Sequence, residues 1–280
     1  MTIISTVIKT ILKITIIQEK IMKTLPSENL RRENKKVSFY IRYIALLITS
    51  SLISACDGIG SLISNTTISQ ADNNQVITIG DSIFALSGEL QDNIESYAGE
   101  TFRRYTLSGA ELSGGSIATS VVDQYYHARQ DDSDIDLVLM DGGGNDILIP
   151  AIMLDPYNCK TEWYQFGHLS EQCKAQIDDI YVEAVNLLNQ MYADDVKNVV
   201  FLGYYYTKNA IFLLDSMEEA IDYGDMRLSQ ACEFSVVHCT FVDPRAVIND
   251  NDIIIDGIHP NHSGSRKLAD LTWPTLKQLL

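Results

Sequence analysis

From residue 76 to the C-terminus, short apolar runs alternate with longer segments whose apolar residues recur at a helical period. Residues 135–140 (IDLVLM) form a nearly continuous apolar run, which is typical of a strand buried in a parallel sheet. The pattern predicts strands at residues 76–79, 102–107, 135–140, 199–203 and 236–242, and helices at 86–97, 117–129, 176–192, 213–232 and 263–279. This alternation favours one parallel sheet with helices on both faces, and residues 147–168 as an irregular insertion or lid.

The segment before this domain has a different pattern. Three basic residues, the last of them Arg42, precede an uncharged and largely apolar run at residues 43–55. Such a run before small residues predicts a secretory signal peptide, because a bilayer span takes roughly 20 apolar residues. Residues 53–56 (ISAC) resemble a bacterial lipobox. The resemblance implies that Cys56 is lipidated and that the chain is an exported bacterial lipoprotein, held at the membrane by its lipid anchor alone and facing the periplasm or the cell exterior. A lone unmodified cysteine in an apolar segment is the alternative.

Three segments are therefore expected along the chain. Residues 1–56 form the signal peptide, in which Met22 is a natural start, so the preceding residues are either an over-long start or an extended basic region. Residues 57–74 are small and polar, as a flexible tether would be, and residues 75–280 form the folded domain. Asp57 follows the predicted lipidated cysteine; in enteric bacteria this favours the inner membrane, but the choice of membrane stays open.

Charge is distributed unevenly between these segments. The whole chain has a formal net charge of −16, but residues 57–280 contain 12 basic and 34 acidic residues, a formal charge of −22. A surface this acidic repels the phosphates of nucleic acids. We therefore expect no nucleic-acid partner.

Export changes the interpretation of the cysteines. With Cys56 reserved for lipid, four remain, namely Cys159, Cys173, Cys232 and Cys239. An even number in an oxidising compartment predicts two disulfides. Three connectivities are open, and we favour the local pairs Cys159–Cys173 and Cys232–Cys239 because short loops close most readily. A zinc site is the alternative, but the closely spaced cysteine pairs of such sites are absent.

Candidate catalytic residues follow the predicted strands, and active residues of parallel sheets gather at those strand ends. After the first strand, Gly80 permits a tight turn and Ser82 opens toward a helix N-terminus, where free N–H groups can stabilise an oxyanion. An ordinary helix cap by Asp81 or Ser82 is the structural alternative. Near the C-terminus, Asp256 and His259 are three residues apart in a turn before Pro260, so the carboxylate can hold the imidazole as a general base.

Two glycine-containing segments complete the candidate set. Residues 141–146 (DGGGND) follow the third strand, and Asn145 can aim its side-chain amide at an oxyanion. A glycine turn that leads into a capped helix would explain this segment equally well. Gly109 follows the second strand and could supply a backbone N–H to the same place.

Together these residues resemble the ordered sequence blocks of the SGNH, or GDSL-like, hydrolases. The blocks are Gly80-Asp81-Ser82, Gly109, Gly143-Gly144-Asn145-Asp146, and Asp256 through Pro260. The resemblance covers the chain from residue 76 onward and implies a flavodoxin-like three-layer α/β/α fold with a five-stranded parallel sheet. It also implies an esterase that needs no metal or other cofactor, with Ser82 as nucleophile, His259 as base and Asp256 as its partner. The oxyanion would be held by Ser82, Gly109 and Asn145.

The substrate and two rival functions remain open at this stage. The expected substrate is a small-molecule, lipid or glycan ester, with lysophospholipids, short acyl esters, thioesters and acetylated sugars all possible. An α/β-hydrolase could instead use Ser116 within residues 114–118 (GGSIA), although no convincing strand precedes it. A catalytically silent lipoprotein of the same fold could bind glycans or partners. The aromatic residues 204–206 are candidates for the pocket wall, whereas the other histidines show no metal-ligand spacing.

Overall fold

The computed structural model describes residues 67–114, 118–161, 168–208 and 216–280. The predicted signal peptide, Cys56 and most of the predicted tether lie outside these residues. No helix within the described ranges is both long enough and apolar enough to cross a membrane.

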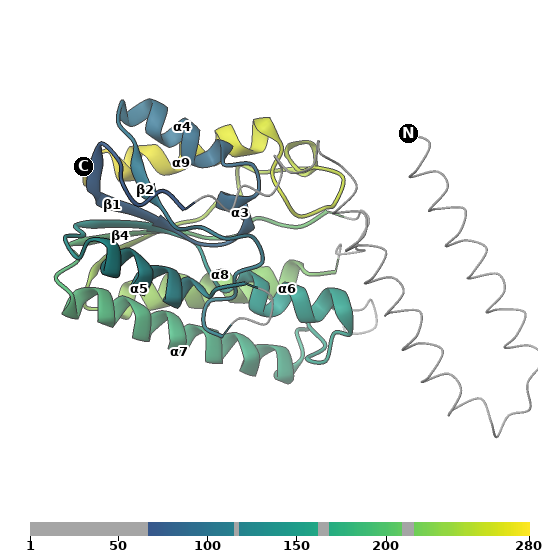
Figure 1. The fold of residues 1–280 in the computed structure, drawn as a ribbon. Helices are drawn as coiled ribbons and strands as arrows, with labels where there is room; N and C mark the ends of the chain where they lie inside the picture. The colour runs from purple at the N-terminus through teal and green to yellow at the C-terminus, as the bar shows by residue number, and fades with distance from the viewer. Residues whose placement is uncertain (1–66, 115–117, 162–167, 209–215) are drawn as a thin grey trace, which may run out of the picture. The chain divides into compact units, whose positions relative to one another are not determined.

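The centre of the fold is a five-stranded sheet in the order β2-β1-β3-β4-β5 (Figure 1). All neighbouring strands pair in parallel. The strands are β1 (Asn73–Ile79), β2 (Phe102–Arg104), β3 (Leu137–Met140), β4 (Asn198–Leu202) and β5 (His238–Val242). The predicted five-stranded parallel sheet is confirmed. Its β2 is shorter than expected, yet the N–H groups of Tyr105 and Leu107 still donate to the carbonyls of Thr78 and Gly80, 2.8 and 3.0 Å away.

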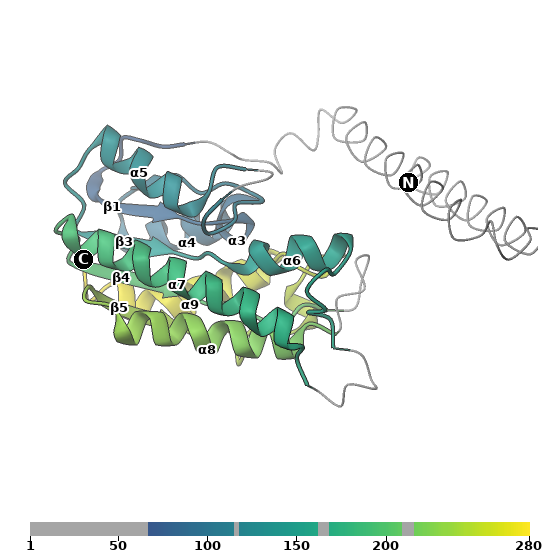
Figure 2. The same cartoon turned by 90° about the horizontal axis from the view of Figure 1, so that it is seen from below.

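Helices cover both faces of the sheet. The helices are α3 (Ser82–Ala85), α4 (Glu89–Ala98), α5 (Val121–Asp131), α6 (Gly144–Met153), α7 (Glu171–Ala193), α8 (Glu218–Phe234) and α9 (His262–Leu276), with a short 3-10 helix, η2, at Asp250–Asp252. In Figure 1, α4 and α9 lie above the sheet, and α5, α7 and α8 lie below it. Figure 2 shows α7 and α8 packed side by side on the lower face. The predicted three-layer α/β/α architecture is therefore confirmed.

Alternation along the strands produces the two cores. In β3, Val138 and Met140 pack toward α5, α7 and α8, whereas Leu137 and Leu139 pack toward α4 and α9. Successive strand side chains point to opposite faces, so an apolar strand supplies both cores at once. This is why residues 135–140 show no polar alternation.

One sequence interpretation was wrong, because residues 147–153 are not irregular but form most of α6. The helix contains Pro150, and a proline inside a helix removes one backbone hydrogen bond and usually disfavours the structure. Burial of Ile147 and Ala151, four residues apart on one helix face, offsets this loss. The chain then turns at Leu154 and Asp155, whose N–H groups both donate to the Pro150 carbonyl.

Both predicted disulfides are present. Cys159 pairs with Cys173 in the first turn of α7, across 14 residues. Cys232 near the end of α8 pairs with Cys239 in β5, across seven residues. The local connectivity is therefore confirmed.

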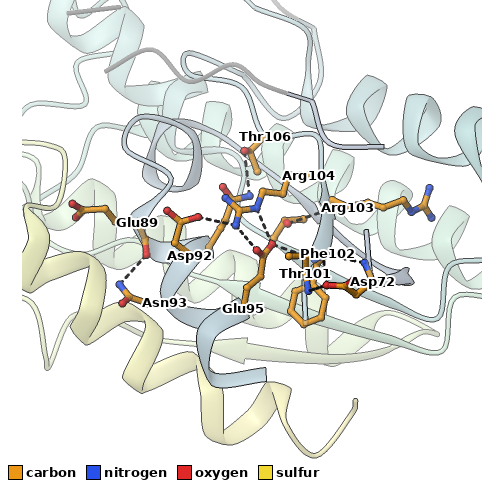
Figure 3. Close-up of polar contacts among 12 residues, drawn as sticks. Asp72, Glu89, Asp92, Asn93, Glu95, Thr101, Phe102, Arg103, Arg104 and Thr106 are labelled. Atoms are coloured by element: carbon orange, nitrogen blue, oxygen red, sulfur yellow. Dashed lines mark hydrogen bonds and ion pairs between the residues drawn. The ribbon is translucent and has the colours of Figure 1, made fainter. Parts of the chain in front are cut away.

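The edge strand β2 sends consecutive arginines to opposite faces (Figure 3). Arg104 points toward α4 and contacts Asp92 at 2.8 Å and Glu95 at 2.5 Å. Arg103 is fully buried and donates to the carbonyls of Asn74, Ala128 and Asp132 at 2.7, 2.9 and 3.2 Å. Arg104 is thus paired with one exposed and one nearly buried carboxylate, and Arg103 with backbone carbonyls.

Candidate active site

Ser82 lies where β1 ends and α3 begins, and its side chain is nearly buried at 9% exposure. Gly80 makes the turn with a φ of +147°, and a Cβ at this position would collide with the carboxylate of Asp141. Asp81 caps α3 by accepting the N–H of Ile83 at 2.9 Å. The capping interpretation and a catalytic one are thus compatible, since Asp81 caps the helix and Ser82 stays available.

Folding brings Ser82, His259 and Asp256 into one hydrogen-bonded chain. His259 Nε2 lies 2.8 Å from Ser82 Oγ across 177 residues of sequence, and His259 Nδ1 lies 2.6 Å from Asp256 Oδ2. The other oxygen of Asp256 accepts the N–H groups of Ile258 and His259 at 2.8 and 3.0 Å. The carboxylate therefore fixes both the imidazole and the turn that carries it.

The environment keeps Asp256 ionised. Burial alone would raise the pKa of this half-buried carboxyl, but the hydrogen bond and charge of His259 and the two backbone N–H groups together lower the pKa below its usual value. A carboxylate in this position orients the ring and stabilises the imidazolium that forms when the base takes a proton.

The loop that carries His259 is held from two sides. Tyr205 donates its hydroxyl to the Ile258 carbonyl at 2.7 Å, and the N–H of Ile254 donates to the His259 carbonyl at 2.9 Å. Tyr205 follows β4, so the strand end positions the loop directly. Of the predicted pocket-wall residues 204–206, Tyr204 and Tyr205 do line the cavity described below, whereas Tyr206 binds Asp222 at an exposed site.

Asp81 and Asp141 form a buried carboxyl pair next to Ser82, and no sequence motif predicted it. The backbone N–H of Asp81 donates to Asp141 Oδ1 at 2.6 Å, and the Tyr204 hydroxyl donates to Asp81 Oδ2 at 2.8 Å. Burial and the adjacent charge of Asp81 raise the pKa of Asp141 well above its usual value, and burial also raises the pKa of Asp81. Asp141 Oδ2 is buried and has no hydrogen-bond partner among the described residues, which suits a protonated carboxyl group.

Gln124 is a second positioning residue that the sequence did not reveal. Its side-chain oxygen accepts the Gly80 N–H at 2.7 Å, and its side-chain nitrogen donates to the Gly80 carbonyl at 3.0 Å. A buried glutamine of α5 thus replaces two backbone partners at the turn before Ser82. No local motif marks it, because the contact spans 44 residues.

Of the three predicted oxyanion donors, Ser82 and Asn145 line the same cavity and Gly109 does not. Asn145, in the first turn of α6, is buried and shares a cavity wall with Ser82. Its Nδ2 donates to the Ala110 carbonyl at 2.9 Å, which ties the Gly109 loop to α6. Gly109 has a left-handed φ of +82° and sits between Leu107 and Ala110, which are joined by a 3.1 Å backbone hydrogen bond. Gly109 itself is not part of that cavity wall.

A cavity of about 90 Å³ opens beside Ser82. Gly144, Asn145 and Tyr204 line it near the serine, and apolar side chains of α6, α7 and α8 form most of the remainder. Asp225 also borders it, but both of its oxygens accept the Tyr204 N–H, at 3.0 and 3.3 Å. Burial raises the pKa of Asp225 to about 7.

Two of the remaining histidines have partners other than the Ser82 site, and one candidate is not described. Ser116 of the alternative α/β-hydrolase interpretation lies outside the described residues. His238 contacts Asn198 at 2.8 Å, and His262 is an exposed residue 3.5 Å from Glu89. Within the described ranges, no group of three or more histidine, cysteine or acidic side chains could hold a metal ion.

Comparison with known proteins places this geometry in context. No family model matches the sequence, and no curated protein sequence matches it either. Solved structures do match. A proposed SGNH hydrolase from Slackia heliotrinireducens aligns with a TM-score of 0.51 at 15% identity, over 72% of this chain and 97% of that one. The chain has the SGNH hydrolase fold.

Two further structures with this fold span a similar part of the chain. A proposed acylhydrolase from Bacteroides fragilis aligns with a TM-score of 0.53 at 15% identity, over 79% of this chain and 94% of its own. A member of a carbohydrate acetylesterase family from Sinorhizobium meliloti aligns with a TM-score of 0.53 at 13% identity, over 74% and 99%. At these identities the similarity establishes the SGNH fold, so the chemistry has to be argued from the residues themselves.

Proposed function

We propose that this chain is a serine esterase of the SGNH family, which cleaves carboxylic esters through an acyl-enzyme on Ser82. The observation that carries the proposal is the hydrogen-bonded chain from Ser82 Oγ to His259 (2.8 Å) and from His259 to Asp256 (2.6 Å). A serine, a base and an orienting carboxylate in this order are the elements of nucleophilic acyl transfer. The descriptions of the structural neighbours as acylhydrolases and acetylesterases agree with this reaction class.

In the first half-reaction, Ser82 Oγ attacks the ester carbonyl carbon while His259 Nε2 takes the hydroxyl proton. The negative charge moves to the carbonyl oxygen, where the N–H groups of Ser82 and Gly109 and the amide of Asn145 stabilise it. Collapse of this intermediate breaks the bond to the alcohol oxygen, which leaves with the proton from His259. The acyl group is then an ester of Ser82.

In the second half-reaction, His259 takes a proton from a water molecule, and the hydroxide attacks the acyl-enzyme. Ser82 leaves with the proton from His259, and the carboxylic acid is released. Throughout, Asp256 stays ionised and stabilises the imidazolium, in keeping with its lowered pKa.

Hydrolysis of p-nitrophenyl acetate and butyrate tests this proposal, with Ser82→Ala compared with Ser87→Ala. Ser87 is an exposed serine five residues downstream, so its replacement controls for the loss of a hydroxyl in the same segment. We expect Ser82→Ala to lower kcat by at least about 10³-fold, since a triad without its nucleophile keeps only residual catalysis. A fluorophosphonate should also label Ser82 in the wild type. Equal turnover in both variants would refute Ser82 as the nucleophile, and a wild type with no turnover above background would favour a protein that only binds.

We also propose that the enzyme is exported and lipidated at Cys56. The two disulfides support an oxidising compartment, and the small residues before Cys56 support processing there. Incorporation of a labelled fatty acid into the wild type, and its loss in Cys56→Ala, is the expected result. Equal labelling of both proteins would exclude Cys56 as the lipidated residue, and no labelling of the wild type would refute the lipid anchor.

A further inference from the structure

The cavity beside Ser82 extends into an apolar space between three helices. Part of its wall is formed by Ile147 of α6, Ile177 and Ile180 of α7, and Ala220, Gly224 and Leu228 of α8. Positions 220, 224 and 228 lie four residues apart, so they form a stripe along one face of α8. A lining of this kind favours an alkyl chain over a sugar, whose hydroxyl groups would lose their hydrogen bonds to water.

The polar side chains in this wall already have protein partners. The carboxylate of Asp225 accepts the Tyr204 N–H. The Arg227 guanidinium lies over the Tyr181 ring at 3.9 Å and is paired with Asp178 at 2.8 Å. Neither group therefore requires a polar ligand.

Gly224 is the most informative residue of the wall. Apart from proline, glycine is the least favourable residue inside a helix, so it needs a local reason there. Packing explains two nearby glycines of the wall. A Cβ at Gly143 would lie 2.8 Å from Ile180, and a Cβ at Gly144 would lie 2.6 Å from Tyr204. A Cβ at Gly224 would meet nothing within 4 Å. Neither packing nor a left-handed backbone explains this glycine, but an open pocket for a ligand does.

The position of the base decides which half of an ester enters the cavity. The leaving alcohol must receive its proton from His259 Nε2, so the alcohol lies on the His259 side of Ser82. Of the loop at residues 256–259 only Ile258 lines the cavity, whereas most of the lining comes from Ser82, Asn145 and the helices α6, α7 and α8. The acyl half therefore extends away from the base and into the space between the helices.

We propose that this cavity binds the acyl chain of a medium-chain ester, and that Gly224 keeps it deep enough to do so. The inference rests on the proposed esterase activity and names its substrate class. The cavity of about 90 Å³ is somewhat more than half the size of an apolar cavity of roughly 150 Å³ that holds one benzene ring. It therefore has room for about four carbons beyond those next to Ser82, so the preferred acyl chain should have about six carbons.

Two series of p-nitrophenyl and alkyl esters test the proposal. In the first series the acyl group grows from acetate to laurate with a constant alcohol; in the second the acyl group is acetate and the alcohol grows. For the wild type, kcat/KM should rise with acyl length by roughly fourfold per buried methylene, up to about hexanoate, and then fall. The alcohol series should show a much weaker trend.

The variants Gly224→Ala, Gly224→Leu and Ser229→Leu locate the effect. Ser229 is exposed on the same helix, so Ser229→Leu adds the same side chain outside the cavity. We expect Gly224→Leu to lower the hexanoate-to-acetate ratio of kcat/KM by at least tenfold and Gly224→Ala by a smaller factor. Ser229→Leu should keep the wild-type ratio. Gly224→Ala guards against misfolding, because alanine favours the helix more than glycine does.

Different results would contradict the acyl-pocket inference and the proposed esterase activity. If Ser82-dependent turnover exists but the ratio is unchanged in Gly224→Leu, the acyl-pocket inference is wrong and the esterase stands. The same conclusion follows if Gly224→Leu alters the alcohol series instead of the acyl series. If no ester is cleaved in a Ser82-dependent way, the proposed function fails and the inference fails with it.

Discussion

Asn145 is the residue at which an oxyanion role can be separated from a structural one. A side-chain amide has two N–H bonds, and one of them is donated to the Ala110 carbonyl. The other is available at the cavity wall shared with Ser82. We expect Asn145→Ala to lower kcat by about 10²–10³-fold with a small change in KM, because the donor acts on charge that develops in the transition state.

Steady-state kinetics and thermal unfolding of the same Asn145→Ala preparation check this prediction. Replacement of Asn145 also removes the bond to Ala110, so some loss of Tm is expected. A lower Tm combined with wild-type kcat at low temperature would assign Asn145 a purely structural role.

Single residues with chemical roles were easier to predict than the residues that hold them in place. Ser82 follows the end of β1, and Asp256 and His259 lie in the turn before α9, each in a short motif. The structure brings their side chains together. Gln124 and Tyr204 carry no such local signal. They act by contacts across 44 and 123 residues, and only the folded topology creates those contacts.

At the scale of elements, β2 supports a test of how a buried arginine stabilises a sheet edge. We expect Arg103→Met to reduce the free energy of unfolding by about 2–4 kcal/mol, because several buried carbonyls lose their donor. Lys197→Met is the control, because it also removes a cation next to a strand of the same sheet. The ion pair of Lys197 with Asp136 is largely exposed, so the loss there should be about 1 kcal/mol or less. Urea denaturation of both variants measures the difference, and equal losses would contradict it.

The two disulfides should stabilise the fold according to the length of chain that they close. The Cys159–Cys173 loop spans 14 residues and the Cys232–Cys239 loop spans seven. The chain-entropy relation gives about 3 kcal/mol for the longer loop and about 2.4 kcal/mol for the shorter one. We expect the double alanine variant of the first pair to unfold at lower urea than that of the second pair. The opposite order would show that native-state contacts of α8 and β5, rather than loop closure, dominate.

Elements with a clean apolar period were predicted well, and those with mixed signals were not. Residues 176–192 fall within α7, whose buried positions recur along one face. The prediction of an irregular lid from residue 147 was wrong, because three glycines and Pro150 disfavour a helix in the sequence pattern although α6 forms there. Tertiary burial of Ile147 and Ala151 stabilises that helix, and a sequence window cannot contain the sheet and helices that bury them.

The overall fold could be predicted in outline because the central strands contribute side chains to two cores, one on each face of the sheet. Apolar residues on both faces of β1, β3 and β4 require helices on both sides, and helical crossovers between parallel strands satisfy this. The same packing also buries acidic side chains near the carboxyl ends of the strands. Asp81 and Asp141 are covered there, as are Asp146 and Asp225. No motif predicted their altered titration, because it depends on the depth of burial.

This buried acid cluster predicts an unusual dependence of stability on pH. Burial raises the pKa of Asp146 and of Asp225 to about 7, and raises those of Asp81 and Asp141 as well. Between pH 4 and 7 the folded protein therefore keeps protons that the unfolded chain has released. Stability from these groups is complete below the unfolded pKa of about 3.9 and is lost as pH rises through about 7. Below pH 4 the opposite holds for Asp256 and Asp252, whose lowered pKa values mean that acid removes their stabilisation.

We therefore expect the free energy of unfolding to be highest near pH 4–5 and to fall toward pH 8. Asp146→Asn tests the cause, because an amide oxygen can still accept the Leu112 N–H, now 2.8 Å from Asp146 Oδ2, but carries no charge at any pH. A pKa of about 7 in place of about 3.9 corresponds to at most about 4 kcal/mol of the free energy of unfolding. The variant should therefore gain roughly 1–4 kcal/mol of stability over the wild type at pH 8 and nothing at pH 4. Urea midpoints at both pH values measure this, with the exposed Asp179→Asn as control. An equal gain at pH 4 and pH 8 would mean that Asp146 acts through packing, since a titrating carboxyl must lose its penalty once it is protonated.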